Sequence, residues 1–139
     1  MKITKSEGQR REELAQKLET AMRDGLAASM ARGRYVEQLS DARGDERAEI
    51  LVKIRSASAA YERAVDAHES LEGKAIAFVA RVAARLRRAY NSRTPKWRSS
   101  RAGVAADSLV RSWEVFSVGA GAFKSVGRLL RELPDASGK

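Results

Sequence analysis

The feature that most constrains the fold of this chain is a repeat between Leu51 and Tyr90 of residues that would form the contact face, or seam, between two paired helices. Its members lie three or four positions apart, as residues on one face of an α-helix do, and they are Leu51, Ile54, Ser58, Tyr61, Val65 and His68, followed by Ala75, Val79, Val82, Leu86 and Tyr90. Prolines occur only at positions 95 and 134, so no proline interrupts the first 94 residues. The pattern predicts long helices that pair through this face, either as one helix to Tyr90 or as two helices separated at Gly73.

A similar period precedes this repeat. It predicts a first helix whose apolar face carries Leu14, Leu18, Met22, Leu26 and Met30, then Val36 and Leu39. Thr4 and Ser6 are both candidate N-caps, since each is followed three residues later by Glu or Gln. In the turn at 41–45, Gly44 can adopt a positive φ. The two helices are therefore expected to form an antiparallel hairpin.

After Tyr90 the sequence NSRTPKWRSS is expected to end the helix, because Pro95 forces Thr94 into an extended conformation. A last helical region is expected at about 100–133, in two pieces that meet at the glycine-containing segment 117–123. The predicted fold is all-α, an antiparallel bundle of four to five helices with a long N-terminal hairpin. We expect one domain, 1–139, with a hairpin at 1–72, a basic helical half at 73–133 and a flexible tail at 134–139.

The net charge of +9 is concentrated in the second half of the chain. Residues 1–72 hold 13 basic and 14 acidic side chains, whereas residues 73–139 hold 14 basic and only 4 acidic ones. No Asp or Glu occurs between Glu72 and Asp107. An asymmetry of this kind indicates a surface directed at a polyanion.

The cations of this stretch are the candidate nucleic-acid-binding residues. On a helix, Lys74, Arg81, Arg85 and Arg88 fall on the face opposite the apolar residues, and Arg87 lies apart from them. The following loop adds Arg93, Lys96, Trp97, Arg98 and Arg101. Trp97 either stacks on a base or folds back onto the bundle. Contact with the phosphates of DNA or RNA, without strong sequence preference, is the leading interpretation.

Catalytic and metal-binding patterns are absent from the sequence. His68 is the single histidine and the chain has no cysteine, so no zinc-binding set or disulfide framework can be assembled. No nucleophile elbow, P-loop or dinucleotide-binding motif is present. We expect a non-enzymatic protein without metal or cofactor, located in the cytoplasm because the N-terminus lacks a secretion signal.

In size, helicity and one-sided charge, the chain resembles the small helical subunits of multi-subunit CRISPR effector ribonucleoproteins. The resemblance covers the general character of the whole chain, includes no signature motif and assigns no residue. It implies a nucleic-acid-binding subunit of a larger assembly. Two alternatives remain open: an interaction module or inhibitor whose basic patch meets an acidic protein or a second copy, and a peripheral membrane protein that binds through residues 115–133.

Overall fold

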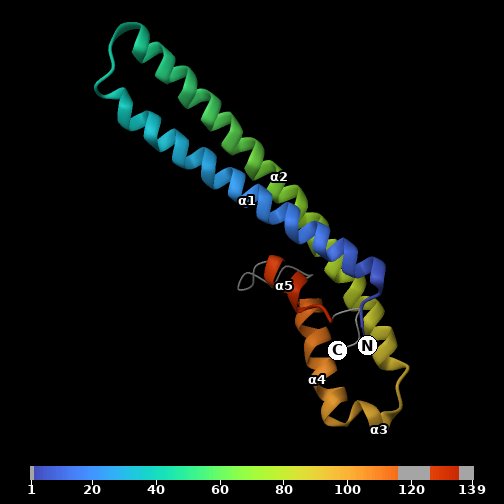
Figure 1. Cartoon of the computed structure of the whole chain (residues 1–139). Helices are drawn as coiled ribbons and strands as arrows, with labels where there is room; N and C mark the ends of the chain where they lie inside the picture. Colours follow the sequence, from blue (N-terminus) through green and yellow to red (C-terminus); the bar gives the residue numbers. More distant parts are fainter. Residues whose placement is uncertain (1, 116–125, 135–139) are drawn as a thin grey trace. The chain divides into compact units, whose positions relative to one another are not determined.

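The computed structural model describes residues 2–115 and 126–134 of the chain, and these residues are almost entirely helical. Their helices are α1 (Lys5–Leu39), α2 (Gly44–Asn91), α3 (Pro95–Arg98), α4 (Arg101–Val115) and α5 (Val126–Glu132), as labelled in Figure 1. No strand occurs in the described part of the chain, which confirms the all-α prediction. Helix α2 continues through Gly73, so the prediction of one helix is confirmed against the prediction of two.

The helices contribute to two compact units. Unit 1 comprises Met1–Ala15 and Glu72–Lys139, and unit 2 is Gln16–Leu71. Unit 1 contains 18 basic and 8 acidic residues, a net charge of +10, whereas unit 2 contains 9 basic and 10 acidic residues. The charge excess of the chain therefore belongs to unit 1.

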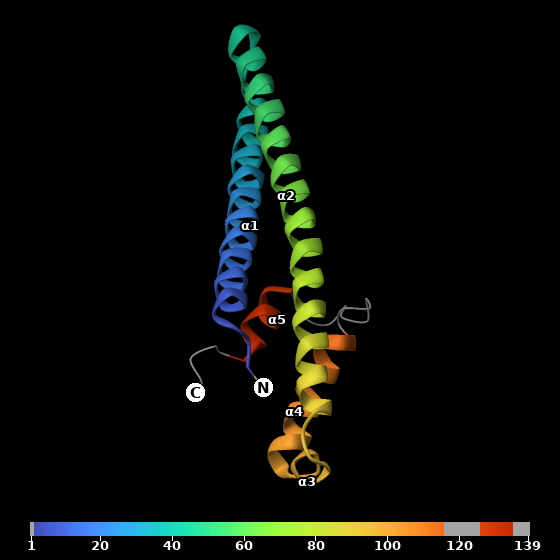
Figure 2. The ribbon, with the colours of Figure 1, turned by 90° about the vertical axis from the view of Figure 1, so that its right-hand side faces the viewer.

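Unit 2 is the antiparallel hairpin that the sequence predicts, with α1 and α2 side by side in both views (Figures 1 and 2). Its turn depends on Gly44, whose φ of 57° lies in the left-handed region that favours glycine. The seam between the helices is built from small residues: a Cβ placed on Gly25 would lie 3.6 Å from the Cβ of Ala64. Its buried members are Leu18, Ala21, Gly25, Ala28, Ile50, Ala57 and Ala64.

The predicted seam of α1 is wrong at Met22, Leu26 and Met30, which are 63%, 63% and 56% exposed. Each four-residue step advances about 40° beyond a full turn, so a series of such steps moves off the contact face. The real seam alternates three- and four-residue steps and uses alanine and glycine. On α2 the predicted seam has the right spacing but is offset by about one position, since Leu51, Tyr61 and Val65 are exposed whereas Ile50, Ala57 and Ala64 are buried.

Unit 1 holds the larger apolar core. Its buried side chains include Ile3 and Leu14 from the N-terminus, Phe78, Val79, Val82 and Leu86 from α2, Val110 and Trp113 from α4, and Leu129, Leu130 and Leu133. The N-terminus is closed against the end of α5 by two hydrogen bonds. Arg11 donates to the carbonyl of Leu133 at 3.0 Å, and the Ile3 amide donates to the carbonyl of Pro134 at 3.4 Å.

The described residues of the C-terminal region form α4 and α5, within the helical region that the sequence predicts. Trp113, Val126, Leu130 and Leu133 are buried, whereas Leu109 is 46% exposed. The predicted hinge at 117–123 and the tail beyond 134 lie outside the described residues. None of the described helices has the long apolar segment that crossing a bilayer requires.

Candidate nucleic-acid interface

The C-terminal half of α2 separates a buried face from a basic one. Val79, Val82 and Leu86 are buried in unit 1. Lys74, Arg81 and Arg88 are exposed and recur at intervals of seven residues, which places them in one row along the helix. Seven residues rise about 10 Å on an α-helix, so the row is roughly 20 Å long.

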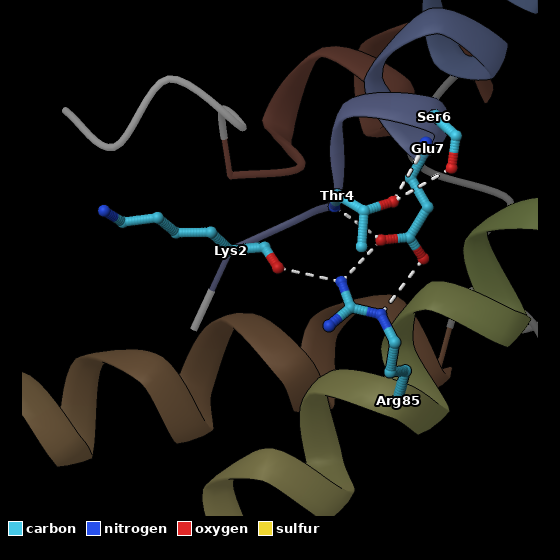
Figure 3. Close-up of polar contacts among 5 residues, drawn as sticks. All are labelled: Lys2, Thr4, Ser6, Glu7 and Arg85. Atoms are coloured by element: carbon cyan, nitrogen blue, oxygen red, sulfur yellow. Dashed lines mark hydrogen bonds and ion pairs between the residues drawn. The ribbon is translucent and has the colours of Figure 1, made fainter.

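Arg85 belongs to the predicted basic face, but a carboxylate from the start of α1 binds it (Figure 3). Its Nε donates to Glu7 Oε2 at 3.1 Å and its Nη2 donates to Glu7 Oε1 at 2.6 Å. The same Nη2 donates to the carbonyl oxygen of Lys2 at 2.8 Å. Arg85 therefore holds the N-terminus of the chain against α2 within unit 1.

Glu7 has a second role, in the predicted capping box at the start of α1. Its Oε1 accepts a hydrogen bond from the Thr4 amide at 2.7 Å, and its own amide donates to Thr4 Oγ1 at 3.1 Å (Figure 3). Partial burial acts to raise the pKa of Glu7, but the hydrogen bonds from Arg85 and Thr4 outweigh it and hold that pKa below its ordinary value. At neutral pH Glu7 is therefore ionised, and its carboxylate accepts hydrogen bonds from Arg85 and from the Thr4 amide.

Arg87 is bound by two carboxylates of α4. It donates to Asp107 through Nη1 and to Glu114 through Nε, the latter at 3.1 Å. Asp107 also pairs with Arg111 at 2.8 Å. The hydrogen bonds from Glu114 and Asp107 raise the pKa of Arg87, and the hydrogen bond from Arg87 lowers the pKa of Asp107. This ion-pair group joins α2 to α4.

The predicted role of Arg85 and Arg87 as phosphate ligands therefore conflicts with their contacts in unit 1. The sequence from 73 to 106 contains no acidic residue, and the carboxylates that bind Arg85 and Arg87 come from α1 and α4. Residues 7, 107 and 114 were not identified as partners. The capping-box pattern identified Glu7 as a structured carboxylate but carried no signal for Arg85, 78 residues away.

The turn after α2 is a defined structure, which includes the one-turn helix α3. Thr94 is its N-cap: its φ and ψ of −63° and 149° are extended, as Pro95 requires, and its Oγ1 accepts a hydrogen bond from the Trp97 amide. A Cβ on Gly103 would meet the backbone carbonyl oxygens of Trp97 and Arg98, the latter at 2.6 Å. Glycine at 103 thus allows α3 to pack closely on α4.

Trp97 packs against side chains at the end of α2 and in the turn that follows it, as the second of the two sequence interpretations expects. Its ring packs edge-on against Tyr90, with 6.0 Å between the ring centroids. The guanidinium of Arg93 lies 5.0 Å from the centre of the Trp97 ring. Trp97 is half-buried, so it supports the turn and positions Arg93.

Seven predicted cations remain without a carboxylate partner in the part of the chain that the structure describes: Lys74, Arg81, Arg88, Arg93, Lys96, Arg98 and Arg101. All are exposed except Arg98, which is half-buried with an Nε that has no hydrogen-bond partner among the described residues. We refer to these seven residues as the basic surface. Arg88 is the last residue of the row on α2. The remaining cations of the basic surface follow it within 13 residues: Arg93, Lys96, Arg98 and Arg101.

Comparison with known proteins adds no further assignment. No protein-family model, curated protein or solved structure matches the chain.

Proposed function

We propose that this chain is a non-catalytic nucleic-acid-binding protein that contacts backbone phosphates through the basic surface. We propose further that it is a subunit of a larger nucleoprotein assembly, as its resemblance to small CRISPR effector subunits implies. The observation that carries the proposal is the division of the cations in unit 1. Arg85 and Arg87 are bound by carboxylates, whereas the seven cations of the basic surface have no such partner among the described residues.

Electrostatics supports a polyanion as the ligand. Unit 1 has a net charge of +10, and the sequence from 73 to 106 contains no acidic residue. A row of cations without counter-charges is self-repelling, and a phosphate backbone relieves that repulsion while releasing its own condensed counterions. This driving force is independent of base sequence.

The position of Trp97 favours phosphate contact over base recognition. A tryptophan that binds single strands offers a free ring face to a base. Trp97 is half-buried between Tyr90 and Arg93. Binding is therefore proposed to depend on the charge of the nucleic acid, and DNA and RNA duplexes both satisfy it.

The test is fluorescence anisotropy with a labelled 24-base-pair DNA duplex and its RNA counterpart at fixed salt. The triple variant Arg81→Gln, Arg88→Gln, Arg101→Gln removes three exposed cations that have no protein partner among the described residues. Its Kd should rise at least tenfold for both duplexes, because three phosphate contacts are lost.

The matched control is Arg32→Gln, Arg34→Gln, Arg63→Gln. It removes the same total charge from exposed positions in unit 2. Its Kd should stay within threefold of the unmodified protein. If the two triple variants weaken duplex binding equally, the loss of affinity comes from net charge alone. That result would contradict the assignment of the basic surface.

A further inference from the structure

One side of the hairpin in unit 2 is apolar and exposed. Four exposed side chains come directly after a residue of the helix–helix contact: Met22 and Val36 on α1, and Leu51 and Val65 on α2. In an antiparallel pair of helices, positions that follow the contact residues fall on the same side. Leu26 lies beside them and is 63% exposed. We refer to this side as the hairpin face, which comprises Met22, Leu26, Ser29, Gly33, Val36, Leu51, Arg55, Ser58, Glu62 and Val65.

The opposite side of the hairpin has a different character. It carries a shallow groove of about 610 Å³, with Ala60 and Ala67 among its lining residues and Gln16, Lys17 and Arg63 beside them. Apart from Leu18 and Ile50, the buried residues of the seam are alanine and glycine. Met22, Leu26, Val36, Leu51 and Val65 are exposed on the hairpin face, where another apolar surface would cover them.

We propose that the hairpin face is covered by a second copy of the same chain, packed antiparallel about a two-fold axis at the level of Ser58. This arrangement joins two hairpins into a four-helix bundle. A two-fold interface requires a self-complementary surface, in which each residue on one side of the axis fits its symmetry partner on the other. The inference does not rest on the proposed nucleic-acid binding.

The sizes of the side chains on α2 satisfy this requirement. Leu51 and Val65 lie seven residues before and seven residues after Ser58. In an antiparallel pair centred on Ser58, Leu51 therefore meets Val65 of the other copy on both sides of the axis. The small side chain of Ser58 lies at the crossing point, where two helices approach most closely.

Four of the five residues that α1 gives to the hairpin face are symmetric about position 31. Leu26 and Val36, both large and apolar, are five residues either side of it, and the small residues Ser29 and Gly33 are two residues either side, whereas Met22 corresponds to Ser40. Gly25 lies opposite Ala64 in the seam, so position 31 is at the level of Ser58. The centres of symmetry of the two helices thus coincide at one level of the hairpin.

Charge on the hairpin face is self-complementary as well. Arg55 precedes Ser58 by three residues and Glu62 follows it by four. Antiparallel packing brings Arg55 of one copy beside Glu62 of the other, and the two-fold axis repeats this contact. Unit 2 contains nearly equal numbers of basic and acidic residues, so two copies meet without net repulsion.

The test uses the absence of cysteine from the chain. In the variant Ser58→Cys, the two thiols lie across the proposed axis, within the short Cα separation that a disulfide requires. Mild oxidation of the full-length variant should give a disulfide-linked dimer in high yield. The control Ser56→Cys places an exposed thiol two residues away on a different side of α2 and should cross-link at least tenfold more slowly.

Sedimentation velocity on the unmodified protein provides the second measurement. It should show a dimer at micromolar concentration, which Arg55→Glu weakens at least tenfold and which Arg55→Glu combined with Glu62→Arg restores. Equal cross-linking of the two cysteine variants, or a monomer at 100 μM, would overturn the proposal. Failure of the double charge reversal to restore the dimer would overturn the antiparallel register.

Discussion

The carboxylate of Glu7 accepts two hydrogen bonds from the guanidinium of Arg85, at 2.6 and 3.1 Å, and so joins the first turn of α1 to α2. The same carboxylate caps α1 through the amide of Thr4. One residue thus fixes a helix end and a contact between two distant segments of unit 1. Arg85 consequently has a structural role that its neighbour Arg88 does not share.

This relationship predicts that Arg85→Gln lowers the stability of the protein. The side chains of Arg85 and Glu7 are 34% and 19% exposed, so their charge-assisted hydrogen bonds are partly screened. We expect a loss of about 1–2 kcal/mol and a fall in Tm of roughly 3–8 °C, measured by circular dichroism. Arg88→Gln is the matched control, because Arg88 is exposed on the same helix, and it should leave Tm within 1 °C. Equal effects of the two substitutions would show that the Glu7 contact contributes nothing.

The lowered pKa of Glu7 predicts a specific dependence on pH. A carboxyl group whose folded-state pKa is below its ordinary value of 4.5 stabilises the protein above that value. This stabilisation is lost as the pH falls from 4.5 through the lower folded-state pKa. In urea unfolding, the difference in unfolding free energy between the unmodified protein and Arg85→Gln should therefore shrink below pH 4.5. A difference that stays constant down to pH 2 would contradict the role of ionised Glu7.

Gly103→Ala should be strongly destabilising. A Cβ at this position would meet the backbone carbonyl oxygens of Trp97 and Arg98, which belong to the turn itself and cannot rotate away. We expect a loss on the order of 2 kcal/mol in chemical denaturation. Gly73→Ala is the control: it lies within α2 with no atom within 4 Å of the added Cβ, and it should stabilise by up to about 1 kcal/mol. A neutral Gly103→Ala would refute the close packing of α3 on α4.

Trp97→Phe should leave nucleic-acid affinity almost unchanged. The phenylalanine ring can still pack against Tyr90 and support Arg93, and the proposed phosphate contacts come from the cations. Fluorescence anisotropy with duplex DNA should give a Kd within threefold of that of the unmodified protein. A loss of tenfold or more for single-stranded DNA, with duplex binding retained, would instead place Trp97 against a base.

Local sequence signals were sufficient for the long helices and for several of their ends, whereas α3 was not predicted. The capping box at Thr4, the positive φ of Gly44 and the extended Thr94 before Pro95 each follow from the chemistry of one or two neighbouring residues. The all-α fold and the hairpin follow from helical periodicity and from the absence of proline before position 95. These features depend on interactions close in sequence.

Features that depend on contacts distant in sequence were not predictable. Sequence patterns favour large apolar residues such as Met22 and Leu26 as the seam, whereas the helices meet through Ala21 and Gly25, whose small size allows close approach. The partners of Arg85 and Arg87 come from α1 and α4, and no local pattern connects them. Of the ten predicted site residues, the structure therefore leaves seven cations available and gives Trp97 a supporting role.

The salt dependence of duplex binding tests the central claim most directly. If all seven cations of the basic surface neutralise phosphates, the logarithm of the binding constant should fall against the logarithm of salt concentration with a slope of about −6. The triple variant lacking Arg81, Arg88 and Arg101 should give a slope nearer −4, because about 0.9 is lost per contact. A slope shallower than about −2 for the unmodified protein, or an identical slope for the variant, would contradict phosphate binding by the basic surface.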